Sequence, residues 1–376
     1  MIYVTVTEVL LYFCFALLGG TLTFYSLDEE KRPDVRMKKQ WLLYATLAAG
    51  VLSFAPILYT IILLGQDTGY WQALTGVLFT FQIGKAWMVT LVLVILLAGL
   101  IYFNDLERDH ILSKLGLILF IGILVTYAKA GHAASLSPTW GFTAHFFHLL
   151  AVSLWTGGLI TAAWFSQSTE RWPNFLRWFT PFSIVCILAA LASGFGTMMI
   201  DIAKPLDHSL SATAYQYKQG LIMNYGEALI IKHLLLIPLI LCAAFNGFYA
   251  KHRLRFAKRS PYAFIKWARV ESIILFFIFA ATAFMGQQKP PHDVAQSILS
   301  GETSPLFAAL YSGTVKSDTV LHFSMTYMTA IFFLIAVLFL VMTAIVIMKK
   351  RSAFIAVVCS VGYLISSYLG VMSGLH

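Results

Sequence analysis

Histidines inside apolar stretches are the residues of this chain best placed to do chemistry. His145 and His148 lie in FTAHFFHLLAVSLWTGGLITAAWF, and His233 lies in ALIIKHLLLIPLILCAAF. An ionisable side chain in hydrocarbon is costly, so its presence in a spanning helix indicates a functional site. Because helix residues three apart share one face, His145 and His148 can serve one ligand.

Several further imidazole and thioether groups fall toward the same predicted side of the membrane. Imidazole and thioether together suit copper, and thioether favours Cu(I). At about 1.5 Å per residue, His148 and His233 lie about 9 and 10 Å below the predicted starts of their helices, so they can share a plane. The predicted metal ligands are His132, His145, His148, His233, Met198, Met199, His322 and Met325.

Two of these placements depend on predicted helix ends. His132 is expected to close the helix that precedes His145, at the outer surface. His322 and Met325 are expected to form a second pair three residues apart, at the outer end of the ninth helix. Trp155, two turns below His148, is expected to cap the site from beneath.

Other interpretations of the same residues stay open. A histidine in a membrane helix can simply hydrogen-bond to a neighbouring helix, and methionines often fill cores. Paired histidines on facing helices also hold haem, so a bis-histidine haem protein is an alternative. A third alternative is a sensor or scaffold that binds copper without moving it.

Composition places the whole chain in a membrane. Of its 376 residues, 59% are hydrophobic and 11% charged, whereas soluble proteins carry about 25% charged residues. Stretches of about 20 apolar residues can cross a bilayer as helix. The predicted fold is therefore an all-α bundle of about ten spanning helices, at residues 4–27, 41–64, 85–103, 115–131, 142–166, 178–200, 226–250, 267–286, 321–348 and 352–372.

The basic residues predict the orientation of this bundle. Of 26 Lys and Arg residues, 19 fall in alternate loops, with the segment KHRLRFAKRS the richest. Basic loops stay on the cytoplasmic side, so both termini are predicted on the outer side. Anionic lipid headgroups account for the net charge of +9, and no nucleic-acid partner is expected. No phosphate-binding GxxxxGK[ST] loop occurs, and no enzymatic activity is expected.

An ordered set of motifs resembles the CopD/PcoD copper-resistance family of membrane proteins. The set begins with Gly131-His132-Ala133 and His145-x-x-His148, the latter followed by Trp155-x-Gly157-Gly158. It continues with Phe182-Ser183, Ser193-Gly194, Tyr225-Gly226, Lys232, Asn246-Gly247, Arg269-x-Glu271 and Lys289-Pro290-Pro291. These motifs extend over roughly residues 110–292, about half of the chain.

The resemblance implies a multi-pass protein of the bacterial cytoplasmic membrane that handles copper, as Cu(I) or Cu(II). It implies inward movement of copper from the outer face, often alongside a separate CopC-type copper-binding protein. The chain is expected to divide into an N-terminal three-helix segment, 1–110, a five-helix core, 111–292, and a C-terminal part with an outer loop and two helices, 293–376.

Overall fold

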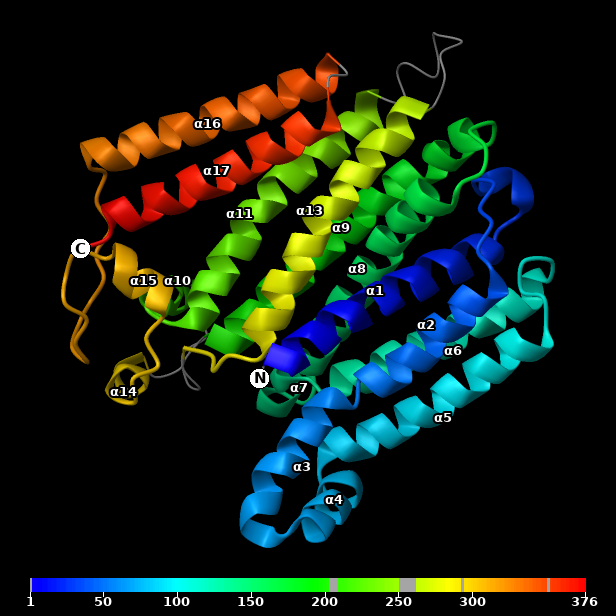
Figure 1. The fold of residues 1–376 in the computed structure, drawn as a ribbon, viewed down its shortest axis with the longest axis horizontal. Helices are drawn as coiled ribbons and strands as arrows, with labels where there is room; N and C mark the ends of the chain where they lie inside the picture. The colour runs from blue at the N-terminus through cyan, green and yellow to red at the C-terminus, as the bar shows by residue number, and fades with distance from the viewer. Residues whose placement is uncertain (1, 203–208, 250–261, 292–293, 350–351) are drawn as a thin grey trace. The chain divides into compact units, whose positions relative to one another are not determined.

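The computed structural model describes residues 2–202, 209–249, 262–291, 294–349 and 352–376, and within them the fold is all-α. Ten helices there are long and apolar enough to span a membrane, which confirms the predicted helix bundle. Helices dominate because each satisfies its own backbone hydrogen bonds in lipid. The spans comprise α1 (Ile2–Tyr25), α2 (Lys39–Leu52) with α3 (Ala55–Thr68), α5 (Gln82–Phe103), α6 (His110–Lys129), α8 (Trp140–Phe165), α9 (Trp172–Ile202), α11 (Asn224–Ala244), α13 (Tyr262–Gly286), α16 (Tyr327–Met348) and α17 (Ala353–Gly374) (Figure 1).

Short helices connect these spans. They are η1 (Glu29–Lys31), α4 (Tyr70–Phe79), α7 (His132–Leu136), α10 (Leu210–Gly220), η2 (Phe245–Tyr249), α14 (Val294–Leu299) and α15 (Pro305–Leu310).

Two predicted spans differ from the observed helices. The second is interrupted after Leu52, and Pro56 lies in the first turn of α3. Proline has no N–H to donate and restricts the residue before it, so a helix restarts there more readily than it continues. The ninth helix begins at Tyr327 rather than at residue 321, because Thr326 caps it by accepting a hydrogen bond from the backbone N–H of Thr329.

The chain divides into two compact units. Unit 1 takes in Met1–Ile200 and Arg253–Ile265, and unit 2 takes in Asp201–His252 and Lys266–His376, as far as those ranges are described. The three-part division at residues 110 and 292 stays a prediction.

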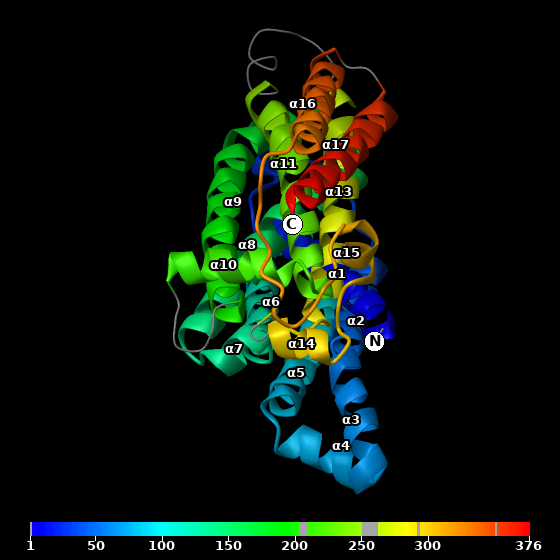
Figure 2. The same cartoon turned by 90° about the vertical axis from the view of Figure 1, so that its left-hand side faces the viewer.

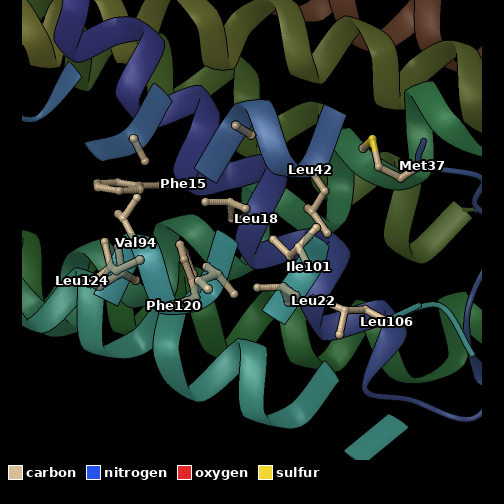
Figure 3. Close-up of a cluster of buried hydrophobic side chains, with 14 of the residues drawn as sticks. Phe15, Leu18, Leu22, Met37, Leu42, Val94, Ile101, Leu106, Phe120 and Leu124 are labelled. Carbon is tan, nitrogen blue, oxygen red and sulfur yellow. The ribbon is translucent and has the colours of Figure 1, made fainter. Parts of the chain in front are cut away.

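The core of unit 1 is formed by α1, α2, α5 and α6. Phe15, Leu18 and Leu22 of α1 are almost wholly buried, and they pack with Phe120 of α6 and Val94 of α5 (Figure 3). Lipid is as apolar as these side chains, so close packing rather than water exclusion holds such helices together.

Helices α1 and α8 approach each other most closely at two glycines. A methyl group on Gly157 would overlap the backbone oxygen of Ala16, and one on Gly20 would overlap the backbone of Gly157. Small residues at a helix crossing allow backbones to meet in this way. The crossing fixes α8, the helix that carries His145 and His148.

Unit 2 contains α11, α16 and α17. Helices α16 and α17 lie side by side in both views (Figures 1 and 2). Its core brings Leu221 and Ile230 together with Phe307, Leu321 and Met372. The segment before α16 is thereby anchored by the fully buried Leu321.

Candidate metal centre

His148 lies half-buried on α8, and its ring has a defined hydrogen-bond partner. Its Nδ1 is 2.9 Å from the backbone oxygen of Ala190 on α9. A carbonyl oxygen only accepts, so Nδ1 carries the proton and the neutral ring has its lone pair on Nε2. Metal-binding histidines commonly donate their other ring N–H to a backbone carbonyl in this way. Nε2 is therefore the ring nitrogen of His148 that has the lone pair a metal ion could bind.

Glycines lie against both histidine rings of α8. A methyl group on Gly194 would lie 3.0 Å from Cε1 and 3.1 Å from Nδ1 of His148. A methyl group on Gly131 would overlap the ring of His145, at 2.5 Å from Cε1. The absence of a side chain at these two positions therefore lets each imidazole reach the backbone of a neighbouring segment.

His132 begins a short helix and does not close the preceding one. Helix α6 ends at Lys129, and Gly131 precedes the first residue of α7 in extended conformation. The prediction of its helical position was wrong because the chain bends at Ala130 and Gly131. His132 is exposed, and it follows directly the glycine that contacts His145.

The contacts between α8 and α9 show how far Met198 and Met199 lie from His148 along the helix axes. His148 meets Ala190 and Gly194, whereas a methyl group on Gly196 would lie 3.5 Å from the side chain of Ala144, so the helices run antiparallel. Met198 is four residues after Gly194 and shares its face of α9. Met198 and Met199 are half-buried and lie about one to two turns from the level of His148, toward the end where α8 begins.

His233 lies on α11 in unit 2 and pairs with a tyrosine. Its Nδ1 is 3.0 Å from the hydroxyl of Tyr217 on α10, and the two rings stack with centroids 5.8 Å apart. Burial raises the pKa of the Tyr217 phenol, so its hydroxyl remains protonated at neutral pH. A hydroxyl can donate or accept, and this contact therefore permits either tautomer of His233.

His322 and Met325 do not form the predicted helical pair. Both precede α16 in an extended segment, and both are exposed. The backbone N–H of His322 donates to the oxygen of His376 at 2.8 Å, and the N–H of His376 donates back at 3.0 Å. The imidazole that neighbours His322 is consequently that of His376, with ring centroids 6.1 Å apart.

A buried carboxylate network in unit 2 was not among the predicted site residues. Glu227, in the first turn of α11, is 5% exposed and accepts hydrogen bonds from Ser304 and from Tyr368, the latter at 2.5 Å. An acidic residue in an apolar run was the signal in the sequence. Its hydroxyl partners lie 77 and 141 residues away and could not be found from spacing.

Two family models match the chain. Residues 2–142 match the copper resistance protein D-like N-terminal domain, and residues 173–285 match copper resistance protein D. The chain belongs to the copper resistance protein D family. The N-terminal match includes the first three helices, which the resemblance noted from the sequence did not reach. No curated protein and no solved structure matches the chain.

Membership of the copper resistance protein D family agrees with a multi-pass membrane protein concerned with copper. His132 falls within the N-terminal match, and His233 falls within the second with Met198 and Met199. His145 and His148 lie between the two matches, and His322 and Met325 lie beyond them.

Within each unit the structure brings some of these groups together. Unit 1 places His148 against α9 and His145 against Gly131, and unit 2 places His233 against Tyr217. Among the described residues, no three His, Cys, Asp or Glu side chains gather as a ligand set. Convergence of His145, His148 and His233 on one ion stays a prediction.

Proposed function

We propose that this member of the copper resistance protein D family binds copper within the membrane and moves it from the outer face across the bacterial cytoplasmic membrane. Copper is the transported substrate in this proposal. The observation that carries it is the imidazole of His148, whose Nδ1 is held by a backbone carbonyl inside a spanning helix. This tautomer makes Nε2 the metal-binding atom, and imidazole is a copper ligand.

The first steps of the proposed route lie at the outer end of α8. His132, exposed beside Gly131, receives the ion and passes it to His145, whose ring lies against that same glycine. His148 follows one turn deeper on the same face of α8. The orientation with both termini outside rests on the distribution of basic residues.

Thioethers extend the proposed route on α9. Met198 shares a helix face with Gly194, the residue that contacts His148, and Met199 is next to it. A thioether is a soft ligand that favours Cu(I), so these methionines serve the reduced ion better than Cu(II).

Within unit 2, His233 is a proposed copper ligand. Its Nδ1 faces the hydroxyl of Tyr217, which can accept a hydrogen bond from a protonated Nδ1, the tautomer that leaves the lone pair on Nε2. His322 and Met325, exposed before α16, are proposed to contribute at the outer surface. A separate CopC-type protein is the proposed donor of copper to this surface.

Copper uptake by the purified full chain in proteoliposomes tests the proposal. We expect wild-type vesicles to accumulate copper and the His148→Ala protein to lose at least about nine tenths of the initial rate, since losing even an indirect contact to a ligand costs 10–100-fold. The His110→Ala protein serves as control, because His110 bonds the backbone of Tyr25 in unit 1 and lies outside the proposed route.

Three outcomes would overturn this function. Unchanged uptake by the His148→Ala protein would remove His148 from the route. Copper binding without any uptake by the wild type would favour a sensor or scaffold. A Soret band in the spectrum of the purified protein would favour the haem alternative, because bis-histidine haem absorbs there.

A further inference from the structure

The segment before α16 and the end of α17 form a short antiparallel pair in unit 2. His322 and His376 exchange both backbone hydrogen bonds, at 2.8 and 3.0 Å, and the N–H of Ser324 donates to the oxygen of Gly374 at 2.8 Å. Residues that exchange both bonds lie directly opposite each other, and their side chains project on one side of the ladder. The end of α17 meets the chain leading into α16 in Figure 1.

The backbone around His322 is fixed on its other side as well. The side-chain amide of Gln219 bonds both backbone groups of Leu321, accepting from its N–H at 3.1 Å and donating to its oxygen at 3.3 Å. Gln219 is 4% exposed and Leu321 is fully buried. The position of His322 is therefore set before any ligand arrives, which lowers the entropic cost of binding.

The two imidazoles are close enough for one metal ion to bind both. Their ring centroids are 6.1 Å apart and the rings are inclined by 34°. With metal–nitrogen distances of about 2.0–2.1 Å, rings bound on opposite sides of one ion have centroids no more than about 6.4 Å apart. Both side chains are exposed, so water can complete the coordination.

The contacts of His376 favour one of its two ring nitrogens as the metal-binding atom. Its Nδ1 lies 3.4 Å from the hydroxyl of Ser324 and 3.4 Å from the oxygen of Gly374. A proton on Nδ1 is favoured by a carbonyl acceptor, even in a long contact, and it leaves the lone pair on Nε2.

We infer that His322 and His376 together form a surface copper site of unit 2, which takes Cu(II) between two imidazoles with water as the remaining ligands. Imidazole and water suit the tetragonal geometry of Cu(II). The choice of copper rests on the proposed function, whereas the pairing of the imidazoles rests on the backbone bonds alone. The partner of His322 in this site is His376 rather than Met325.

Electron paramagnetic resonance of the full chain in detergent tests this site, with Cu(II) chloride added in less than molar amount. Spin-echo modulation counts the imidazoles on the ion, and titration gives the affinity. All proteins in this test also carry His145→Ala and His148→Ala, so that the imidazoles of the proposed route do not add a second two-imidazole class. In that background we expect a class of Cu(II) with two imidazoles. Adding His322→Ala or His376→Ala should abolish this class and weaken Cu(II) binding by at least about tenfold.

The controls separate loss of the site from loss of fold. The His110→Ala protein should keep the two-imidazole class, and the His322→Ala/His376→Ala double variant should bind no more weakly than either single variant. His322→Gln keeps a polar side chain and the backbone bonds, and it should lose the class while the thermal midpoint is retained. Persistence of the two-imidazole class in either alanine variant would overturn the inference.

The same proteins distinguish this inference from the proposed function. If His148→Ala retains full uptake while the two-imidazole class depends on His322 and His376, the function fails and the surface site stands. If His148→Ala loses uptake while the His322 and His376 variants keep the class, the surface site fails and the function stands.

Discussion

His148 in unit 1 and His233 in unit 2 are both half-buried on spanning helices, yet their partners differ in kind. His148 donates from Nδ1 to the carbonyl of Ala190, which can only accept. His233 meets the hydroxyl of Tyr217, which can also donate. The first contact selects one tautomer and the second permits two. The partner of a histidine, more than its burial, therefore determines whether Nε2 always carries the lone pair that binds a metal ion.

Alanine substitutions of His148 and His233 should differ most in their effect on copper accumulation. We expect His148→Ala to lower cellular copper accumulation by at least about tenfold and His233→Ala to lower it by about two- to fivefold, because only the first removes a ligand already in the binding tautomer. Copper content per cell, corrected for protein amount in the membrane, measures the effect. A greater loss from His233→Ala than from His148→Ala would show that the fixed tautomer of His148 does not decide its contribution.

The glycines that contact the histidine rings of α8 allow a second test. Replacing one of them by alanine moves a ring and leaves the histidine itself in place. Gly131→Ala should displace the ring of His145 and weaken Cu(I) binding by about tenfold, in line with the cost of disturbing a ligand's support. Gly194→Ala, with its contacts of 3.0 and 3.1 Å to His148, should weaken binding less. Competition with a coloured Cu(I) chelator measures both affinities.

Gly99→Ala is the matched control for these two variants. A methyl group on Gly99 of α5 would have no atom within 4 Å apart from its chain neighbours and the backbone of its own helix, so copper binding should not change. An equal loss of affinity in all three variants would point to a general effect of alanine on the helices and against contact with the histidine rings.

The smallest effect is expected at Tyr217. Tyr217→Phe removes the hydroxyl that can donate to His233, so Cu(I) affinity should rise slightly if His233 is a ligand. The lost hydrogen bond should lower the free energy of unfolding by about 0.6 kcal/mol, the average found for such bonds in a membrane protein. Tyr215→Phe is the control, since Tyr215 lies on the same helix and is 46% exposed. A fall in affinity specific to Tyr217→Phe would show that the hydroxyl assists binding.

The spanning helices were predictable because lipid imposes one solution on an apolar chain. Within the part of the chain that the structure describes, each of the ten predicted spans overlaps one observed span, since each must satisfy its backbone internally. The break near Pro56 and the cap at Thr326 also have local signals in the sequence. These are a proline, which favours the start of a helix, and a threonine, whose hydroxyl can cap one. Extending the ninth helix back to residue 321 overlooked that cap and gave the wrong partner for His322.

The helix positions of several candidate ligands could be predicted from the sequence, whereas their contacts could not. Spacing correctly placed His145 and His148 on one helix. It could not reveal that His148 bonds Ala190, 42 residues away, or that His376 pairs with His322. Such contacts depend on how helices pack and on backbone pairing between distant segments, and neither leaves a periodic signal in the sequence.

A structure of the copper-loaded protein, with anomalous scattering recorded at the copper edge, tests whether His148 binds copper through Nε2. We expect a copper peak about 2 Å from Nε2 of His148, a typical metal–imidazole distance, with Nδ1 still bonded to the oxygen of Ala190. A copper peak on Nδ1 with that bond broken, or the absence of bound copper beside His148, would exclude this role of His148.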